Sequence, residues 1–268
     1  MADKKHRKLS FHKMIPNMIT LTAMAAGMTA IKFAIVGKWE EAVIAIVAAA
    51  FMDAFDGAAA RLLKAQSKLG AELDSLSDFV SFGVAPALVT FLWVTHDAGR
   101  FGWITALIFM MAVALRLARF NISKEEEVSE DPLSKYFTGV PSPAGAGLAL
   151  LPMIISFQLD SKTNANVFDI ATDPYAVGLW LIILAVMMVS YIPTFSSKQI
   201  RVPQRMSVPA LALFGLLIAG LINEPWPTLT LMGALYLLFM PWSVIHYARK
   251  KKSLAQGIKD PDDLDHDE

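Results

Sequence analysis

Long apolar runs alternate with short polar segments along most of the 268-residue chain. A helix that crosses the hydrocarbon core of a bilayer needs about 20 predominantly apolar residues. The pattern therefore predicts an all-α, polytopic transmembrane bundle with about eight spans. The predicted spans are residues 15–36, 40–63, 72–94, 102–121, 140–158, 175–195, 206–222 and 227–247. Pro141, Pro143 and Pro152 weaken the fifth span and the seventh is short, so six or seven spans are the alternatives.

Composition supports a membrane protein and excludes several chemistries. Hydrophobic residues make up 55% of the chain and charged residues 18%, compared with roughly 25% charged in an average soluble domain. The mean hydropathy is +0.47. The absence of cysteine excludes disulfides, thiolate metal sites and cysteine nucleophiles. A formal net charge of zero gives no global field that would attract nucleic acid, so we expect no nucleic-acid partner.

The basic residues predict how the chain is oriented. Cytoplasmic loops of membrane proteins carry an excess of lysine and arginine. With the N-terminus inside, the inner segments hold most of the 24 lysines and arginines, and the outer ends keep Lys32, Lys38, Arg100 and Lys162. We therefore expect both termini in the cytoplasm and a multi-pass protein of the cell (inner) membrane.

Two pairs of aspartates interrupt this apolar pattern. Asp53 and Asp56 follow an uninterrupted apolar run, residues 43–52, and Asp74 and Asp78 lie at the start of the third span. Spacings of i,i+3 and i,i+4 place the members of each pair on one face of a helix. A carboxylate inside a membrane helix costs about 2.5–3.5 kcal/mol unless it faces a polar cavity or a partner. A hairpin of the two helices can bring all four carboxylates together.

Clustered carboxylates point to divalent cations, because four anions repel one another unless cations neutralise them. All-oxygen ligation suits Mg²⁺, Mn²⁺ or Ca²⁺, and two ions would balance four carboxylates. The alternative is a set of helix caps and ion pairs with Arg61, Lys64 and Lys68 as partners. Gly57 and Ala60 leave room beside the carboxylates for a ligand, and the Arg61 guanidinium suits phosphate.

The aspartates belong to a longer motif. Residues 53–78 read D-x-x-D-G-x-x-A-R-x8-G-x-x-x-D-x-x-x-D, which resembles in full the hallmark of the CDP-alcohol phosphatidyltransferase family. The resemblance implies a six-helix core, here the first six spans, followed by two additional helices. It implies transfer of a phosphatidyl group from a CDP-lipid to a small alcohol at a centre of two divalent ions, Mg²⁺ or Mn²⁺. It also implies that Asp53, Asp56, Asp74 and Asp78 bind metal, and that Asp78 is the general base for the incoming hydroxyl.

The same resemblance implies where the CDP-lipid lies. The first span begins P-N-M-I-T at residues 16–20, which is similar to the P-N-x-x-T entry of the family. A proline at a helix start with an asparagine cap explains this short segment equally well without a ligand. The CDP-lipid contacts implied in this way are Asn17, Thr20, Gly57, Arg61 and Ser67.

Segments around the motif resemble the serine-accepting members of the family from bacteria and archaea. These segments are ELDSLSDFVSFGVAPA (residues 72–87), GVPSPA (139–144) and IPTFS (192–196), and the D-P-x-A-D-K run usual in phosphatidylglycerophosphate synthases is missing. We therefore expect CDP-diacylglycerol as the donor and L-serine as the acceptor. Arg116, Arg119 and Lys135 are candidates to bind the serine carboxylate, although positive-inside topology alone would also explain them.

Other functions remain open from the sequence. The acceptor could instead be a glycerol phosphate, choline or inositol. A membrane prenyltransferase normally has two aspartate motifs far apart in the chain, and a divalent-cation transporter would have carboxylates near the midplane and a repeated half-motif. The resemblance further implies a homodimer. We expect four regions: a cytoplasmic amphipathic segment (1–14), the family transmembrane domain (15–197), two additional helices (198–247) and a charged cytoplasmic tail (248–268).

Overall fold

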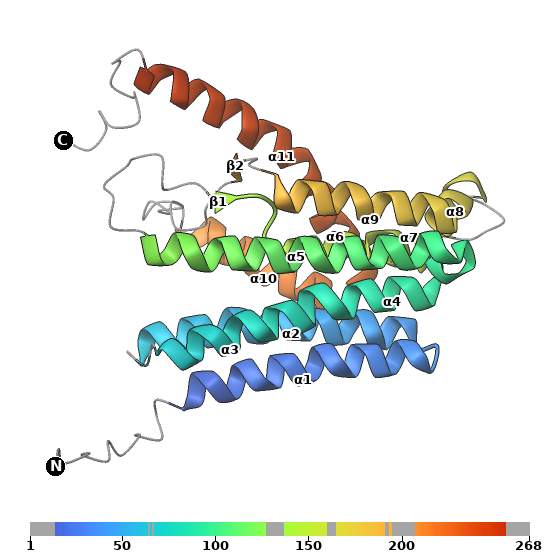
Figure 1. Ribbon diagram of the computed structural model, residues 1–268, viewed down its shortest axis with the longest axis horizontal. Helices are drawn as coiled ribbons and strands as arrows, with labels where there is room; N and C mark the ends of the chain where they lie inside the picture. The colour runs from blue at the N-terminus through green and yellow to red at the C-terminus, as the bar shows by residue number, and fades with distance from the viewer. Residues whose placement is uncertain are drawn as a thin grey trace.

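The computed structural model describes residues 14–63, 65, 67–126, 137–159, 165–190, 193–194 and 207–255. Nearly all of these residues are helical, and most of the helices run side by side along one long axis (Figure 1). The predicted all-α bundle is therefore confirmed. Large apolar side chains also lie on the outside of the bundle, and Ile35, Leu115 and Val186 are each at least 60% exposed. A surface of this kind suits a surrounding of lipid chains.

The first half of the chain forms the longest helices. They are α1 (Ile15–Ile35), α2 (Trp39–Leu62), the continuous segment of α3 (Lys68–Asp78), the π-helix η2 (Phe79–Val84) and α4 (Ala85–Trp93), and α5 (Arg100–Glu126), with the 3-10 turn η3 (Thr95–Ala98) before α5. Within the described residues, four helical segments are long and apolar enough to cross a membrane, and all four lie in this half. They coincide with the first four predicted spans.

The second half contains shorter helices. They are α6 (Ser142–Ala149), α7 (Leu151–Ser156), α8 (Ala165–Ala171), α9 (Pro174–Val189), α10 (Ser207–Asn223) and α11 (Pro225–Ala255). Two short strands, β1 (Phe137–Thr138) and β2 (Pro193–Thr194), pair in antiparallel fashion and join the start of α6 to the end of α9. The fifth predicted span is thus two helices, and the break at Leu150 precedes Pro152, which has no N–H to continue a helix. The total of eight spans remains a prediction.

The third segment packs tightly against the first helix. The Ser81 hydroxyl, within η2, donates a hydrogen bond to the Ala23 carbonyl of α1 over 3.2 Å. Opposite it lies Gly27, where a β-carbon would come within 2.7 Å of the Ser81 Cα atom. Glycine therefore permits the approach of the two backbones, and this approach fixes α3 beside α1.

The buried core has two parts that meet at α6 and α7. One part packs α1, α2 and α4 together and includes Phe82 and Met153. The other packs α5 against α9 and α11 and includes Phe109, Leu181 and Met188. The start of α1, the connection from α2 to α3 and the C-terminal part of α11 all lie at one end of the bundle (Figure 1).

Candidate metal and substrate site

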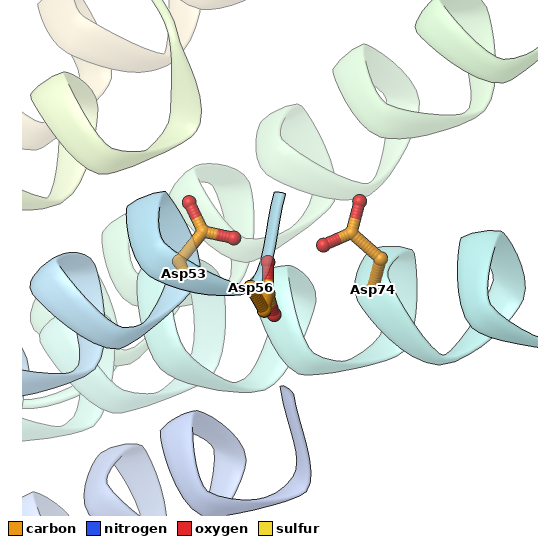
Figure 2. A group of neighbouring side chains, drawn as sticks. All are labelled: Asp53, Asp56 and Asp74. Atoms are coloured by element: carbon orange, nitrogen blue, oxygen red, sulfur yellow. The ribbon is translucent and has the colours of Figure 1, made fainter. Parts of the chain in front are cut away.

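Three of the predicted aspartates meet between α2 and α3. Asp53, Asp56 and Asp74 each offer a carboxylate oxygen, and these oxygens lie within 4.8 Å of one another. Figure 2 shows the Asp53 and Asp74 carboxylates directed toward each other, with Asp56 between them. Asp56 is buried, with 4% of its surface exposed. A compact group of carboxylates inside an apolar helix pair is a donor set that fits a divalent cation.

The fourth aspartate, Asp78, lies one turn further along α3. Its side chain is hydrogen-bonded to that of Asp53, and its Oδ1 atom is buried without a hydrogen-bond partner. Asp78 is not a member of the group of three, so its place among the metal ligands remains a prediction. Its contact with Asp53 nevertheless keeps it directly beside that group.

The first helix holds Asp56 in place through Thr20. The Thr20 hydroxyl donates a 2.6 Å hydrogen bond to Oδ2 of Asp56 and also lies 3.0 Å from the Pro16 carbonyl. The Ser77 hydroxyl of α3 in turn donates to the Thr20 carbonyl over 3.0 Å. The sequence singled out Thr20 for the CDP-lipid, but its contact in the structure is with a carboxylate. Hydroxyl-bearing residues are common where helices pack, so the sequence did not predict the hydrogen bond between Thr20 and Asp56.

The remaining residues implied for the CDP-lipid lie at the same end of α2 and α3. Ser67 caps α3, because its hydroxyl accepts a 3.0 Å hydrogen bond from the Gly70 N–H. Asn17 is next to this cap, and a β-carbon on Gly70 would come within 2.9 Å of Asn17 Oδ1. Beside Gly57 there is open space, with the Arg61 guanidinium as the nearest group at 4.0 Å from a β-carbon placed there. The surface beside these residues can therefore admit a ligand.

The two arginines proposed for the acceptor have different surroundings. Arg116, on α5, donates a 2.7 Å hydrogen bond through Nη1 to the Ser142 hydroxyl, and its Nε atom is buried without a partner. Arg116 also interacts electrostatically with Asp78. Arg119 donates through Nη1 to the Val189 carbonyl over 2.8 Å and so ties α5 to the end of α9. Lys135, the third candidate, lies outside the described residues.

A cavity of about 380 Å³ lies beside α2. Its walls come from α2, α6, α7, α10 and α11 and are almost wholly apolar, apart from the phenol of Tyr236. Ala54, the neighbour of Asp53 in the chain, belongs to the wall, as do Pro143 and Ala144, which follow Ser142. The cavity therefore extends along α2 to the level of the carboxylates.

The chain is similar in sequence to known proteins. Residues 13–190 match the family model described as CDP-alcohol phosphatidyltransferase, and residues 205–241 match the one described as CDP-alcohol phosphatidyltransferase 2. The second match covers all of α10 and the first half of α11, where the sequence patterns offered no resemblance.

Curated relatives are similar over most of the chain. A Mycobacterium tuberculosis protein named CDP-diacylglycerol–serine O-phosphatidyltransferase is 32% identical over 91% of this chain and 81% of its own length. A Helicobacter pylori protein of the same name is 34% identical over 84% of this chain and 89% of its own length. The Bacillus subtilis protein of that name is 39% identical over 53% of this chain and 75% of its own length.

Proposed function

Since the chain belongs to the CDP-alcohol phosphatidyltransferase family, we propose that it transfers the phosphatidyl group of CDP-diacylglycerol to L-serine and releases CMP. The observation that carries this proposal is the group of three carboxylates with Asp78 and Arg116 beside it. The names of the relatives and the segments around the motif both support serine as the acceptor.

The proposed metal site holds two divalent ions, Mg²⁺ or Mn²⁺. Its proposed ligands are Asp53, Asp56, Asp74 and Asp78. The grouped oxygens of Asp53, Asp56 and Asp74 support the first three members of this set, because hard cations prefer carboxylate oxygens. When bound, the ions would neutralise the pyrophosphate of the donor and stabilise the departing CMP. Thr20 keeps the Asp56 carboxylate oriented toward the group through its hydrogen bond.

In the proposed reaction the serine hydroxyl oxygen attacks the β-phosphorus of CDP-diacylglycerol. A phosphorus–oxygen bond to serine forms, and the bond between the β-phosphorus and the oxygen it shares with CMP breaks. The hydroxyl proton passes to Asp78, the proposed general base, which has a buried oxygen without a partner. The donor nucleotide is proposed to contact Asn17, Thr20, Gly57, Arg61 and Ser67, and the apolar cavity beside α2 suits an acyl chain.

The cellular setting is proposed from the sequence. Both termini and the carboxylate group would face the cytoplasm, at the inner membrane, as the distribution of basic residues predicts. The chain would act as a homodimer, with residues 15–197 as the family domain and 198–247 as two additional helices.

The proposal is tested with the purified chain, CDP-diacylglycerol and Mg²⁺ or Mn²⁺, in an acceptor screen of serine, glycerol 3-phosphate, inositol and choline. We expect CMP release and a phosphatidylserine product with L-serine, and loss of both when the metal is chelated. A cation transporter cannot release CMP from the donor. Robust turnover with another alcohol and none with serine would reject the assignment.

A further inference from the structure

Buried polar atoms without partners gather at one place in the bundle. Within the described residues, four buried side-chain atoms have no hydrogen-bond partner, and one of them, the Thr95 hydroxyl, is in η3 beyond α4. The other three are Oδ1 of Asp78, Nε of Arg116 and the hydroxyl of Tyr236. A buried donor or acceptor without a partner costs about 1–3 kcal/mol, so three together need an explanation.

The three atoms come from helices far apart in the chain, and Arg116 links them at the start of α6. Asp78 ends α3, Arg116 is on α5 and Tyr236 is on α11. Arg116 interacts electrostatically with both Asp78 and Tyr236. Arg116 also contacts Ser142. The two residues that follow Ser142, Pro143 and Ala144, line the cavity together with Tyr236.

The chemistry of these atoms describes the ligand that would satisfy them. Arg116 Nε–H and the Tyr236 O–H are two donors beside a permanent positive charge, and such a pair suits an anion that accepts two hydrogen bonds. The Asp78 oxygen is an acceptor and suits a hydroxyl group. A carboxylate and a hydroxyl on one small molecule would satisfy all three atoms.

We propose that Tyr236, on α11, binds the carboxylate of the acceptor amino acid together with Arg116 and thereby determines which alcohol is accepted. This inference rests on the proposed function, since it requires serine as the acceptor. An uncharged ester of the donor lipid is the other group that a tyrosine hydroxyl in this cavity could contact. The positive charge of Arg116 favours the carboxylate, because an ester carbonyl gains less from a neighbouring cation than an anion does.

Tyr236→Phe is the direct test, because it removes the hydroxyl and keeps the ring that lines the cavity. Loss of a hydrogen bond to a charged group lowers affinity by roughly tenfold or more. We expect the KM for L-serine to rise by about tenfold, with the KM for CDP-diacylglycerol and the kcat at saturating serine nearly unchanged. The matched control is Tyr175→Phe on α9, whose exposed ring stacks on Phe101 away from the site and should leave all three values unchanged.

Inhibitors provide a readout that does not depend on the variant's turnover. L-alanine has the carboxylate and amine of serine but no hydroxyl, and ethanolamine has the amine and hydroxyl but no carboxylate. L-alanine should compete with serine in the wild type. Its inhibition should weaken by about tenfold in Tyr236→Phe, whereas inhibition by ethanolamine should not change. A wild type inhibited by ethanolamine but not by L-alanine contradicts carboxylate recognition without any mutant.

The outcomes separate this inference from the proposed function. If the wild type uses serine and Tyr236→Phe raises only the KM for CDP-diacylglycerol, the hydroxyl contacts the lipid and the inference is wrong, while the function stands. An unchanged serine KM in Tyr236→Phe also overturns the inference and leaves the function intact. If the wild type does not use serine at all, both are rejected together.

Discussion

The four aspartates of the site have different surroundings, and Asp78 differs most from the other three. Asp53, Asp56 and Asp74 share one small volume, whereas Asp78 has one oxygen against Asp53 and the other buried without a partner. The three grouped carboxylates have the arrangement of ligands. The separate position of Asp78 suits a group that must reach both the ligands and the attacking hydroxyl.

Asp78→Asn should therefore lower kcat severely while CDP-diacylglycerol binding largely survives. General-base catalysis typically contributes about 10²–10⁴-fold, and an amide cannot accept the proton. Asp56→Asn should damage both kcat and metal affinity, since it alters one of the proposed metal ligands. Steady-state kinetics over a range of metal concentrations distinguish the two effects.

Asp97→Asn is a suitable control, because Asp97 lies exposed in η3 beside His96, beyond α4. It should leave kcat and metal affinity unchanged. Near-normal kcat in Asp78→Asn across pH would rule out Asp78 as the base and leave attack without a protein base.

Thr20→Val tests whether the hydroxyl of Thr20 serves the metal site. The substitution keeps the shape of the side chain and removes the donor to Asp56. Loss of a group that orients a metal ligand typically costs about 10–100-fold in metal affinity. We expect the Mg²⁺ or Mn²⁺ concentration for half-maximal activity to rise at least about tenfold.

Thr22→Val is the matched control, since the Thr22 hydroxyl is exposed and bonds only to the Met18 carbonyl of its own helix. It should not change the metal requirement. If Thr20→Val instead raises the KM for CDP-diacylglycerol at an unchanged metal requirement, Thr20 acts on the nucleotide, as the family resemblance implies.

The sequence could predict the aspartates but not their partners. Asp53, Asp56, Asp74 and Asp78 stand out because charge inside an apolar helix is costly and helical spacing is local. The P-N-x-x-T segment indicated Thr20 only as a nucleotide contact, and Tyr236 gave no signal at all, since hydroxyl-bearing residues are common in membrane helices. The hydrogen bond of Thr20 to Asp56 and the electrostatic interaction of Tyr236 with Arg116 join residues that are distant in the chain and meet only when the helices pack.

At the scale of helices, the close approach of α1 and η2 depends on one glycine. Gly27→Ala would force a β-carbon against the Ser81 backbone, so the two helices must separate. Overpacking of this kind typically costs about 1–3 kcal/mol. We expect a lower apparent Tm in detergent and lower activity, because α3 carries Asp74 and Asp78.

Gly215→Ala, within α10, provides the control for helical glycines. A β-carbon there meets nothing within 4 Å, and alanine is the better helix former. The Tm should be unchanged or slightly higher. Equal losses of Tm in both variants would contradict the close contact at Gly27.

Helix positions were predictable where hydropathy alone decides them, as in α1, α2 and α5. The third segment begins at Lys68, before the predicted span, because Ser67 caps it, and a serine cap is a signal that the sequence does contain. The π-helix at Phe79–Val84 could not be predicted, because its apolar residues read like any buried helix. Its wider turn packs against α1 and α5.

At the scale of the molecule, the orientation in the membrane can be tested because the chain contains no cysteine. Lys68→Cys would place a thiol at the start of α3, and Asp97→Cys one in η3, at the other end of the same helical segment. Because both positions are exposed, each thiol can react with an impermeant maleimide. We expect Asp97→Cys to be labelled in intact cells and Lys68→Cys only in inside-out vesicles.

The cysteine-free parent protein should not be labelled from either side. Labelling of both variants in intact cells would contradict a crossing by residues 68–93. The reversed pattern would keep the crossing and overturn the cytoplasmic position of the carboxylates.

The hydrogen bond between Thr20 and Asp56 also has a consequence for biosynthesis. The translating ribosome releases α1 and α2 before α3, so Asp53 and Asp56 can reach the bilayer before Asp74 and Asp78 have emerged. Thr20 belongs to the helix that emerges first, and it gives Asp56 a donor as soon as the first hairpin closes. A carboxylate in an apolar helix is costly without a partner, so this donor gives the second helix a polar contact before the third segment arrives.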